Sequence, residues 1–204
     1  MADNTERSFR DKWTNNSDLA FAQTLDETSA IFRWIIERNG FQSGDDLRKF
    51  LDGRRRILDA GCGNGRVTAL LRRYSDPRHA EVLGIDLVAA DIAQRNLADQ
   101  LNVSFRQKDL LGDLSDLGQF DFIYCQEVLH HTADPKRAFM NLCARLAPGG
   151  EIAIYVYKKK APTREFVDDF VRERIAGLPY REAMTVCAQI TELGRMLSEA
   201  KGKV

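Results

Sequence analysis

The sequence lacks the signals of a disulfide-bonded, metal-binding or membrane-spanning protein. Its four cysteines include no Cys-x-x-Cys pair, and its three histidines do not stand at zinc-ligand spacing from them. No uncharged run approaches the roughly 20 residues that span a membrane. The charged first residues, MADNTERSFRDKW, lack the apolar centre of a secretory signal. We therefore expect no disulfide framework, no metal site, no membrane segment and a reducing cytoplasm as the location.

The sequence also lacks a net charge, because 30 basic and 30 acidic residues cancel among 204. Proteins that hold nucleic acid by bulk electrostatics are basic, so we find no strong nucleic-acid signal. The hydrophobic content of 44% excludes a disordered chain. The length suits one domain with a small addition.

Short apolar segments alternate with amphipathic ones through the middle of the chain. Parallel strands need crossover connections, so this alternation predicts an α/β fold with a parallel sheet. The flanking residues 1–53 and those from 161 onward carry helical patterns, and APGG at 147–150 predicts a tight turn. Strands are expected at 55–61, 81–86, 102–107, 120–125 and 151–157, and helices between them at 64–74, 88–101 and 135–146.

The most informative segment is the glycine-rich LDAGCGNGRVTALL at 58–71. A strand ends at Ala60, and a turn with three glycines leads into a helix whose first amides are free to bind a ligand. Asp86 closes the second strand 21 positions after Gly65, where a carboxylate can accept from ribose hydroxyls. Asp109 and the leucine after it follow the third strand, where a base could be held. The pattern predicts a nucleotide-cofactor site, against the plainer alternative of a tight turn without a ligand.

A nicotinamide site is the main alternative for such a loop. That site favours Gly-x-Gly-x-x-Gly, whereas here the sixth position counted from Gly61 is Arg66. Its side chain disfavours the close helix–sheet packing of the nicotinamide motif, so we rank an oxidoreductase lower.

Five segments together resemble the class I S-adenosylmethionine-dependent methyltransferases, and most of all the small-molecule enzymes related to ubiquinone and menaquinone biosynthesis. The resemblance implies a Rossmann-like three-layer sandwich with parallel sheet order 3-2-1-4-5, S-adenosylmethionine as cofactor, and a small-molecule methyl acceptor. The matching segments are LDAGCGNG (58–65), GIDL (84–87), KDLL (108–111), FDFIYCQEVLHH (120–131) and LAPGGEIAIYVY (146–157).

The resemblance also implies cofactor-binding positions. Aromatic residues near the N-terminus, Phe9 and Trp13, are further candidates that would cover the sulfonium, or else pack their own helix. The implied cofactor residues are Asp59 near the amino group, Gly61, Cys62, Gly63 and Asn64 along the methionine part, Asp86 and Leu87 at the ribose and adenine, Asp109 and Leu110 at the adenine, and Gln126 at the methionine carboxylate or the transfer site.

A general base is needed only if the acceptor must lose a proton. His130, His131 and Glu127 follow the fourth strand and are the catalytic candidates. Packing near the cofactor is the alternative for the histidines, and a solvated loop acid is the alternative for Glu127. Lys158–Lys160 would attract an acidic substrate or simply end a strand, and Arg54–Arg56 are expected at the surface.

The chain departs from the family pattern after Tyr157, because the final antiparallel hairpin strands are not apparent. The fifth strand would then be an open sheet edge, covered by a second copy in a homodimer, by the C-terminal helices, or by a C-terminal segment missing from a truncated chain. The alternative functions are a non-catalytic or truncated S-adenosylmethionine-binding module and, ranked lower, a tRNA or protein methyltransferase. We expect an N-terminal helical cap (1–53), a cofactor domain (54–157) and a helical extension (158–204) that forms part of a substrate cap.

Overall fold

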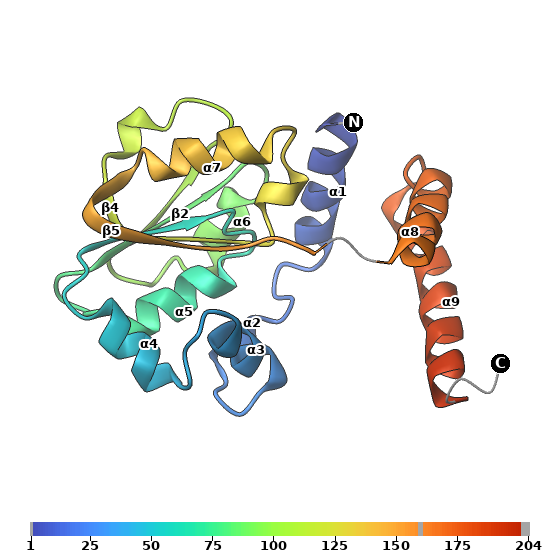
Figure 1. The fold of residues 1–204 in the computed structure, drawn as a ribbon, viewed down its shortest axis with the longest axis horizontal. Coiled ribbons are helices and arrows are strands. Elements are labelled where there is room, and N and C mark those ends of the chain that lie inside the picture. The colour runs from blue at the N-terminus through green and yellow to red at the C-terminus, as the bar shows by residue number, and fades with distance from the viewer. Residues whose placement is uncertain (1, 159–160, 201–204) are drawn as a thin grey trace. The chain divides into compact units, whose positions relative to one another are not determined.

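The computed structural model describes residues 2–158 and 161–200 (Figure 1). They form two compact units divided between Tyr157 and Lys158. The first unit contains α1 (Ala2–Asn15), α2 (Phe21–Leu25), α3 (Ala30–Arg38), α4 (Gly44–Leu51), β1 (Arg56–Ala60), α5 (Arg66–Tyr74), β2 (Glu81–Asp86), α6 (Ala90–Asn96), β3 (Val103–Gln107), η1 (Ser115–Leu117), β4 (Phe120–Gln126), η2 (Leu129–His131), α7 (Pro135–Cys143) and β5 (Leu146–Tyr155). The second contains α8 (Pro162–Ile175) and α9 (Tyr180–Glu199).

The five strands form one parallel sheet in the order β3-β2-β1-β4-β5, which confirms the predicted fold class. In this order β2 and β3 lie on one side of β1, and β4 and β5 lie on the other side. The register pairs Ala60 with Ile85 and Asp86 with Gln107, so these three strands end together at one edge of the sheet. Loops that follow the strands therefore meet at this edge, where ligands bind in open parallel sheets.

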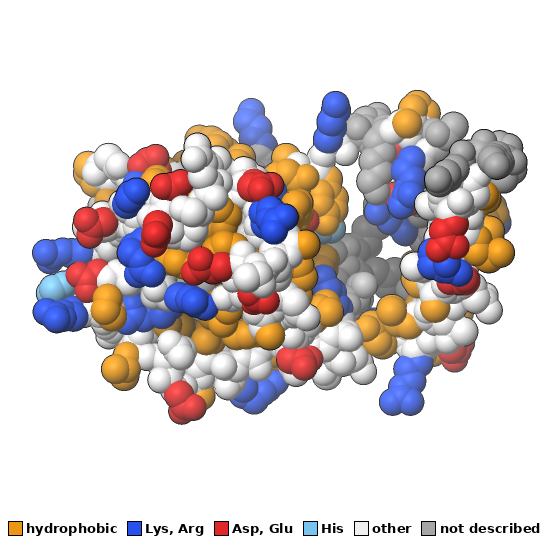
Figure 2. All heavy atoms as spheres, turned by 90° about the horizontal axis from the view of Figure 1, so that it is seen from below, with side chains coloured by type: hydrophobic (Ala, Val, Ile, Leu, Met, Phe, Trp, Pro, Cys, Tyr) orange, Lys and Arg blue, Asp and Glu red, His pale blue; other side chains and the backbone are white. Residues whose placement is uncertain are grey.

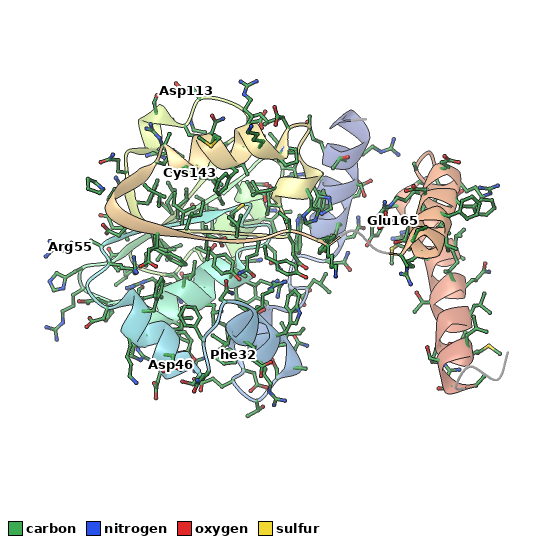
Figure 3. The ribbon with its side chains drawn as sticks, in the orientation of Figure 1. Phe32, Asp46, Arg55, Asp113, Cys143 and Glu165 are labelled. Atoms are coloured by element: carbon green, nitrogen blue, oxygen red, sulfur yellow. The ribbon has the colours of Figure 1, made fainter. Side chains whose placement is uncertain are left out.

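Alternating side chains divide the core into two layers. Ile57 and Phe122 face a cluster with α3, α4 and α5, whereas Leu58 and Ile123 face a cluster with α7 and η1. This period of two is what a strand buried on both faces requires. Figure 1 shows α4 and α5 on one side of the sheet and α7 on the other, and Figure 3 labels Phe32 and Cys143 in these two layers.

Three predicted boundaries were wrong. The helix expected at 135–146 ends at Cys143, because Leu146 already pairs with Phe120 in β5. The segment 147–150 is not a separate turn but lies within β5, where the pairing jumps from Phe120↔Leu146 to Phe122↔Glu151. The extra residues bulge out of the ladder, and Gly149 takes a φ of +78° that favours glycine. The helix expected at 88–101 ends at Asn96, because the chain turns with Gln100 N–H donating to Leu97 O.

The surface carries charges of both signs, in agreement with the equal numbers of basic and acidic residues. Basic and acidic side chains are interspersed over the visible face of the sheet-containing unit (Figure 2). The four cysteines are free; Cys62 and Cys125 are buried, and Cys143 and Cys187 are half-buried. Within the described ranges no helix has the length and apolarity to cross a membrane, and no strand pairs with the outer edge of β5. The apolar side chains of α8 and α9 are largely exposed, including Phe166 and Phe170.

The α7 layer leads to a stability prediction with a matched control. Leu142 is a completely buried residue of α7, whereas Leu101 is 79% exposed. We expect Leu142→Ala to lower the free energy of unfolding by about 2–5 kcal/mol, since it removes buried methyl groups and leaves a cavity. Leu101→Ala should change it by less than about 0.5 kcal/mol. Urea denaturation followed by circular dichroism measures both, and equal losses would contradict the assigned layer.

Candidate functional site

A cavity of about 640 Å³ opens where the loops after β1, β2, β3 and β4 meet. Its volume lies within the range of small-molecule sites. Helix α1 contributes Phe9, Lys12 and Trp13 to its wall, and Tyr157 contributes from beyond β5. A second hollow of about 600 Å³, lined by residues 18–23 and Asn96, contains none of the predicted site residues.

The glycine-rich loop runs so close to its neighbours that side chains are excluded. Gly61 has a φ of +83°, and a Cβ there would lie 2.2 Å from a methyl of Val128. Gly63 has a φ of +55°, and a Cβ there would lie 2.7 Å from the Trp13 indole. Gly61 N–H donates to Ile85 O over 2.7 Å, which holds the loop against β2. Glycine is therefore required here both by backbone conformation and by space.

Asp86 connects the two loops that border the cavity. One carboxylate oxygen accepts from Gly63 N–H, and the other accepts from the N–H groups of Val88 and Ala89, each over 2.9 Å. A carboxylate offers about four acceptor positions, so three are taken by these amides and about one faces a ligand. The carboxylate thus fixes the loop geometry and keeps an acceptor for a hydroxyl group.

Asp59 lies deeper in the same wall and is 2% exposed. Burial raises the pKa of its carboxyl group to about 7, although the hydroxyl of Thr68, which donates to it over 2.6 Å, opposes the shift. Arg66 lines the cavity nearby and donates to the hydroxyl of Thr24 over 2.9 Å. Burial lowers the pKa of Arg66. The wall therefore holds a carboxyl group whose charge depends on pH beside a fixed cation.

The other predicted cofactor positions also reach the cavity. Leu87, Asp109 and Leu110 line it after β2 and β3, and Asp109 accepts from the N–H of Leu111 over 2.8 Å. Cys62 and Gln126 line it after β1 and β4. Asn64 lines it as well, while its amide nitrogen donates to Ser17 O and Leu19 O over 3.1 Å. The Asn64 side chain thus also ties the loop to the segment after α1.

Helix α1 closes one side of the cavity. Arg10 attaches it to the β2–α6 region, donating to Val88 O over 2.6 Å and pairing with Asp91 over 2.5 Å. Both Phe9 and Trp13 line the cavity, and the Lys12 ammonium lies 4.4 Å from the centre of the Trp13 ring. Burial lowers the pKa of Lys12. The aromatic pair predicted from the sequence is therefore placed at the cavity and not only inside its own helix.

Two of the three catalytic candidates line the cavity and the third does not. Glu127 and His131 belong to its wall. His130 stacks on Tyr157 with ring centres 4.1 Å apart, and neither of its buried ring nitrogens has a hydrogen-bond partner. Burial lowers the pKa of His130. His130 therefore packs beside the cavity and does not line it.

Glu127 is held in an unusual backbone conformation. Its φ is +60°, a region that residues with a side chain rarely adopt, and its N–H donates to Tyr155 O over 2.9 Å. Burial raises the pKa of the Tyr157 hydroxyl, and the charge of Glu127 and a hydrogen bond to its carboxylate raise it further. Arg38 lies 3.6 Å from the Glu127 carboxylate. The strained backbone therefore turns a carboxylate toward the cavity between a phenol and a guanidinium group.

Sequence reasoning missed several cavity residues. Arg38, Lys12 and Arg66 are cations that line it, but the sequence patterns singled out neither Arg38 nor Lys12 and treated Arg66 only as a departure from a motif. The spacing of Trp34 and Arg38, one helical turn apart, was an available signal for a stacked pair. Lys158 is exposed and outside the cavity wall, and Lys159 and Lys160 lie outside the described residues.

The surface assignment of the arginines before β1 was partly wrong. Arg55 is exposed (Figure 3). The Arg54 side chain is only 15% exposed, because it stacks on Phe50 at 4.0 Å and donates to Asp121 O over 2.8 Å.

A parallel sheet of this order, with a glycine-rich loop after β1 and a carboxylate at the end of β2, defines the class of domains that bind nucleotide cofactors. Comparison with known proteins narrows this class. A family model described as a methyltransferase domain matches residues 27–200. The chain therefore belongs to the class I S-adenosylmethionine-dependent methyltransferases, which confirms the family predicted from the sequence.

Individual relatives agree with the family model. The chain is 34% identical over 152 residues to a ubiquinone biosynthesis O-methyltransferase of Psychrobacter cryohalolentis, covering 68% of this chain and 56% of that protein. It is 33% identical over 99 residues to the protein of the same name from Coxiella burnetii, covering 47% and 41%. An uncharacterised Synechococcus protein is 43% identical over 113 residues, covering 52% and 26%. The chain thus spans between 26% and 56% of the length of these curated relatives.

Solved structures share the fold. The N-methyltransferase NodS from Bradyrhizobium japonicum, crystallised with S-adenosylhomocysteine, matches with a TM-score of 0.56 at 24% identity over 74% of this chain and 72% of that one. The CurJ carbon methyltransferase matches with a TM-score of 0.55 at 20% identity, covering 82% and 50%.

The raised pKa of Asp59 predicts how stability depends on pH. The pKa of Asp59 is higher in the folded chain than its ordinary value of 3.8, so the folded state holds this proton more tightly than the unfolded state does. The resulting stabilisation is complete below about pH 3.8 and is lost as the pH rises to about 7. We expect Asp59→Asn to flatten the decrease in free energy of unfolding between about pH 4 and about pH 7. Asp113→Asn, an exposed carboxylate outside the cavity wall, is the control (Figure 3). A profile for Asp59→Asn as steep as that of the unaltered chain would contradict the burial of this charge.

Proposed function

We propose that the protein transfers the methyl group of S-adenosylmethionine to a small-molecule acceptor. The observation that carries the proposal is that every residue predicted to bind this cofactor, from Trp13 to Gln126, lines the same cavity. A small acceptor is supported by the relative that is a ubiquinone biosynthesis O-methyltransferase, whereas NodS is named only as an N-methyltransferase. Those names differ in the atom methylated, so the proposal extends to the class of acceptor and not to the atom.

The cavity wall offers a binding group for each part of the cofactor. In this proposal Asp109 and Leu110 hold the adenine after β3, and Asp86 holds a ribose hydroxyl after β2. The glycine loop, Gly61 to Gly63, passes under the methionine part, where its lack of side chains allows close approach. Asp59 accepts from the amino group, which favours the ionised carboxylate and lowers its raised pKa.

The reaction demands little of the protein beyond placement. The sulfonium supplies an already activated methyl group. Trp13 and Phe9 line the cavity with aromatic rings, which favour a cation, and α1 limits the access of water. In-line displacement depends mainly on alignment, and the fixed loops and helix provide it. Glu127 and His131 are the groups in the wall that can take a proton from a hydroxyl or amine acceptor.

The cellular setting and the domain boundaries are part of the same proposal. A cytoplasmic location is supported by four free cysteines. We also propose that residues 1–53 act as a cap, since α1 supplies part of the cavity wall. We further propose that residues 158–204 contribute to a substrate cap. We also propose that a homodimer covers the edge of β5.

Binding of S-adenosylhomocysteine to the unaltered chain is the primary test. Calorimetry should show one binding site, and Asp86→Ala should weaken binding by at least about tenfold, since it removes a hydrogen bond to the ligand and releases Gly63 of the glycine loop from the end of β2. The affinity of Asp86→Asn should lie between those of the unaltered chain and Asp86→Ala, because asparagine keeps one acceptor oxygen. Asp113→Ala, which alters a carboxylate outside the cavity, should bind as the unaltered chain does.

Turnover separates an enzyme from a pure binding module. The unaltered chain should release S-adenosylhomocysteine from S-adenosylmethionine when incubated with a panel of phenols, quinols and amines. Binding without release against the whole panel would favour the non-catalytic alternative. Failure to bind S-adenosylhomocysteine at all would reject both.

A further inference from the structure

Arg38 is buried in the cavity wall with an unusual surrounding. Its side chain is 9% exposed, and its guanidinium carbon lies 3.2 Å from the centre of the Trp34 ring and 4.3 Å from that of Tyr155. Stacking against both rings holds the orientation of the planar group. The side chain nonetheless lines the cavity, so the rings position a cation at the surface of the site.

The guanidinium group has unsatisfied donors. Its Nε and Nη1 atoms are both buried and have no hydrogen-bond partner. Glu127 forms an ion pair with Nη1 over 3.6 Å, which is longer than a hydrogen bond. Burying a guanidinium without hydrogen bonds is costly, and such groups are normally satisfied by acceptors. The arrangement therefore favours a ligand that brings acceptor oxygens to Arg38.

The sheet order places Arg38 away from the residues proposed for the adenosine. Its contacts are Tyr155 in β5 and Glu127 directly after β4, whereas Asp86 and Asp109 follow β2 and β3 on the other side of β1. Two other cations in the wall lie nearer the methionine end. Arg66 follows the glycine loop directly, and Lys12 stands over Trp13, which contacts Gly63. These two cations are therefore the candidates for the carboxylate of the methionine part.

We propose that Arg38 selects an acceptor that carries a carboxylate on a small planar ring. A carboxylate matches the planar donor fork of a guanidinium, and the rings of Phe9 and Tyr157 in the wall suit a flat molecule. This inference rests on the proposed function, since it assigns the substrate class of the same site. Arg38 acts here as a specificity-determining residue.

The test compares an acid with its amide in the presence of saturating S-adenosylhomocysteine. Calorimetry with the full chain uses 4-hydroxybenzoate and 4-hydroxybenzamide, which share ring and shape but differ in charge. The unaltered chain should bind the acid at least about tenfold more tightly than the amide. Arg38→Met keeps an apolar stem of similar length and should abolish this preference. Arg38→Lys keeps the charge without the planar fork and should retain only part of it.

Arg33→Met is the matched control, because Arg33 is an exposed arginine on the same helix and outside the cavity wall. It should leave the preference unchanged. Affinity for S-adenosylhomocysteine alone should change by less than about threefold in Arg38→Met, since the inference places Arg38 beyond the cofactor.

Two outcomes would overturn the inference. One is equal binding of acid and amide by the unaltered chain, or binding of neither. The other is a tenfold or greater loss of S-adenosylhomocysteine affinity in Arg38→Met with the acid preference intact, which would assign Arg38 to the cofactor carboxylate. Failure of the unaltered chain to bind S-adenosylhomocysteine is a different result and counts against the proposed function itself.

Discussion

The hydrogen bonds of the Asp86 carboxylate to the amides of Gly63, Val88 and Ala89 hold together the two loops on which the site depends. A charged acceptor shared by three amides fixes the distance between the end of β1 and the end of β2. The glycine loop can then lie against Val128 and Trp13, where no side chain fits. The part of the cavity wall that the glycine loop forms depends on this connection.

The site divides along the sheet into two chemical regions. Carboxylates and backbone amides follow β2 and β3, where hydroxyl and amino groups of a nucleoside would be recognised. Around β4 and β5 the wall instead contains aromatic rings, the Arg38 guanidinium and the strained Glu127. Parallel order creates this division, because each strand delivers its own loop to the same edge. We infer that the region after β2 and β3 binds the cofactor and that the region around β4 and β5 binds the methyl acceptor.

Much of the fold could be predicted because its signals are local. Apolar strand segments, the three-glycine turn and Asp86 are read directly from neighbouring residues, and the observed sheet order confirmed the family expectation. The bulge at Gly149 was missed, since it depends on how β5 pairs with β4. His130 could not be separated from His131, because adjacent residues in one short turn point to different surroundings, one against Tyr157 and the other into the cavity wall.

The sequence by itself determined the class of fold, the cofactor loop and the family, because these depend on residue spacing along single segments. Only the tertiary structure decided which charges share the cavity. Arg38, Lys12 and Arg66 come from helices that are separated in the chain and meet only when α1, α3 and α5 pack around the strand ends. Burial and proximity also set the raised pKa of Asp59 and leave the Arg38 donors without acceptors, and neither property belongs to a residue before its neighbours are in place.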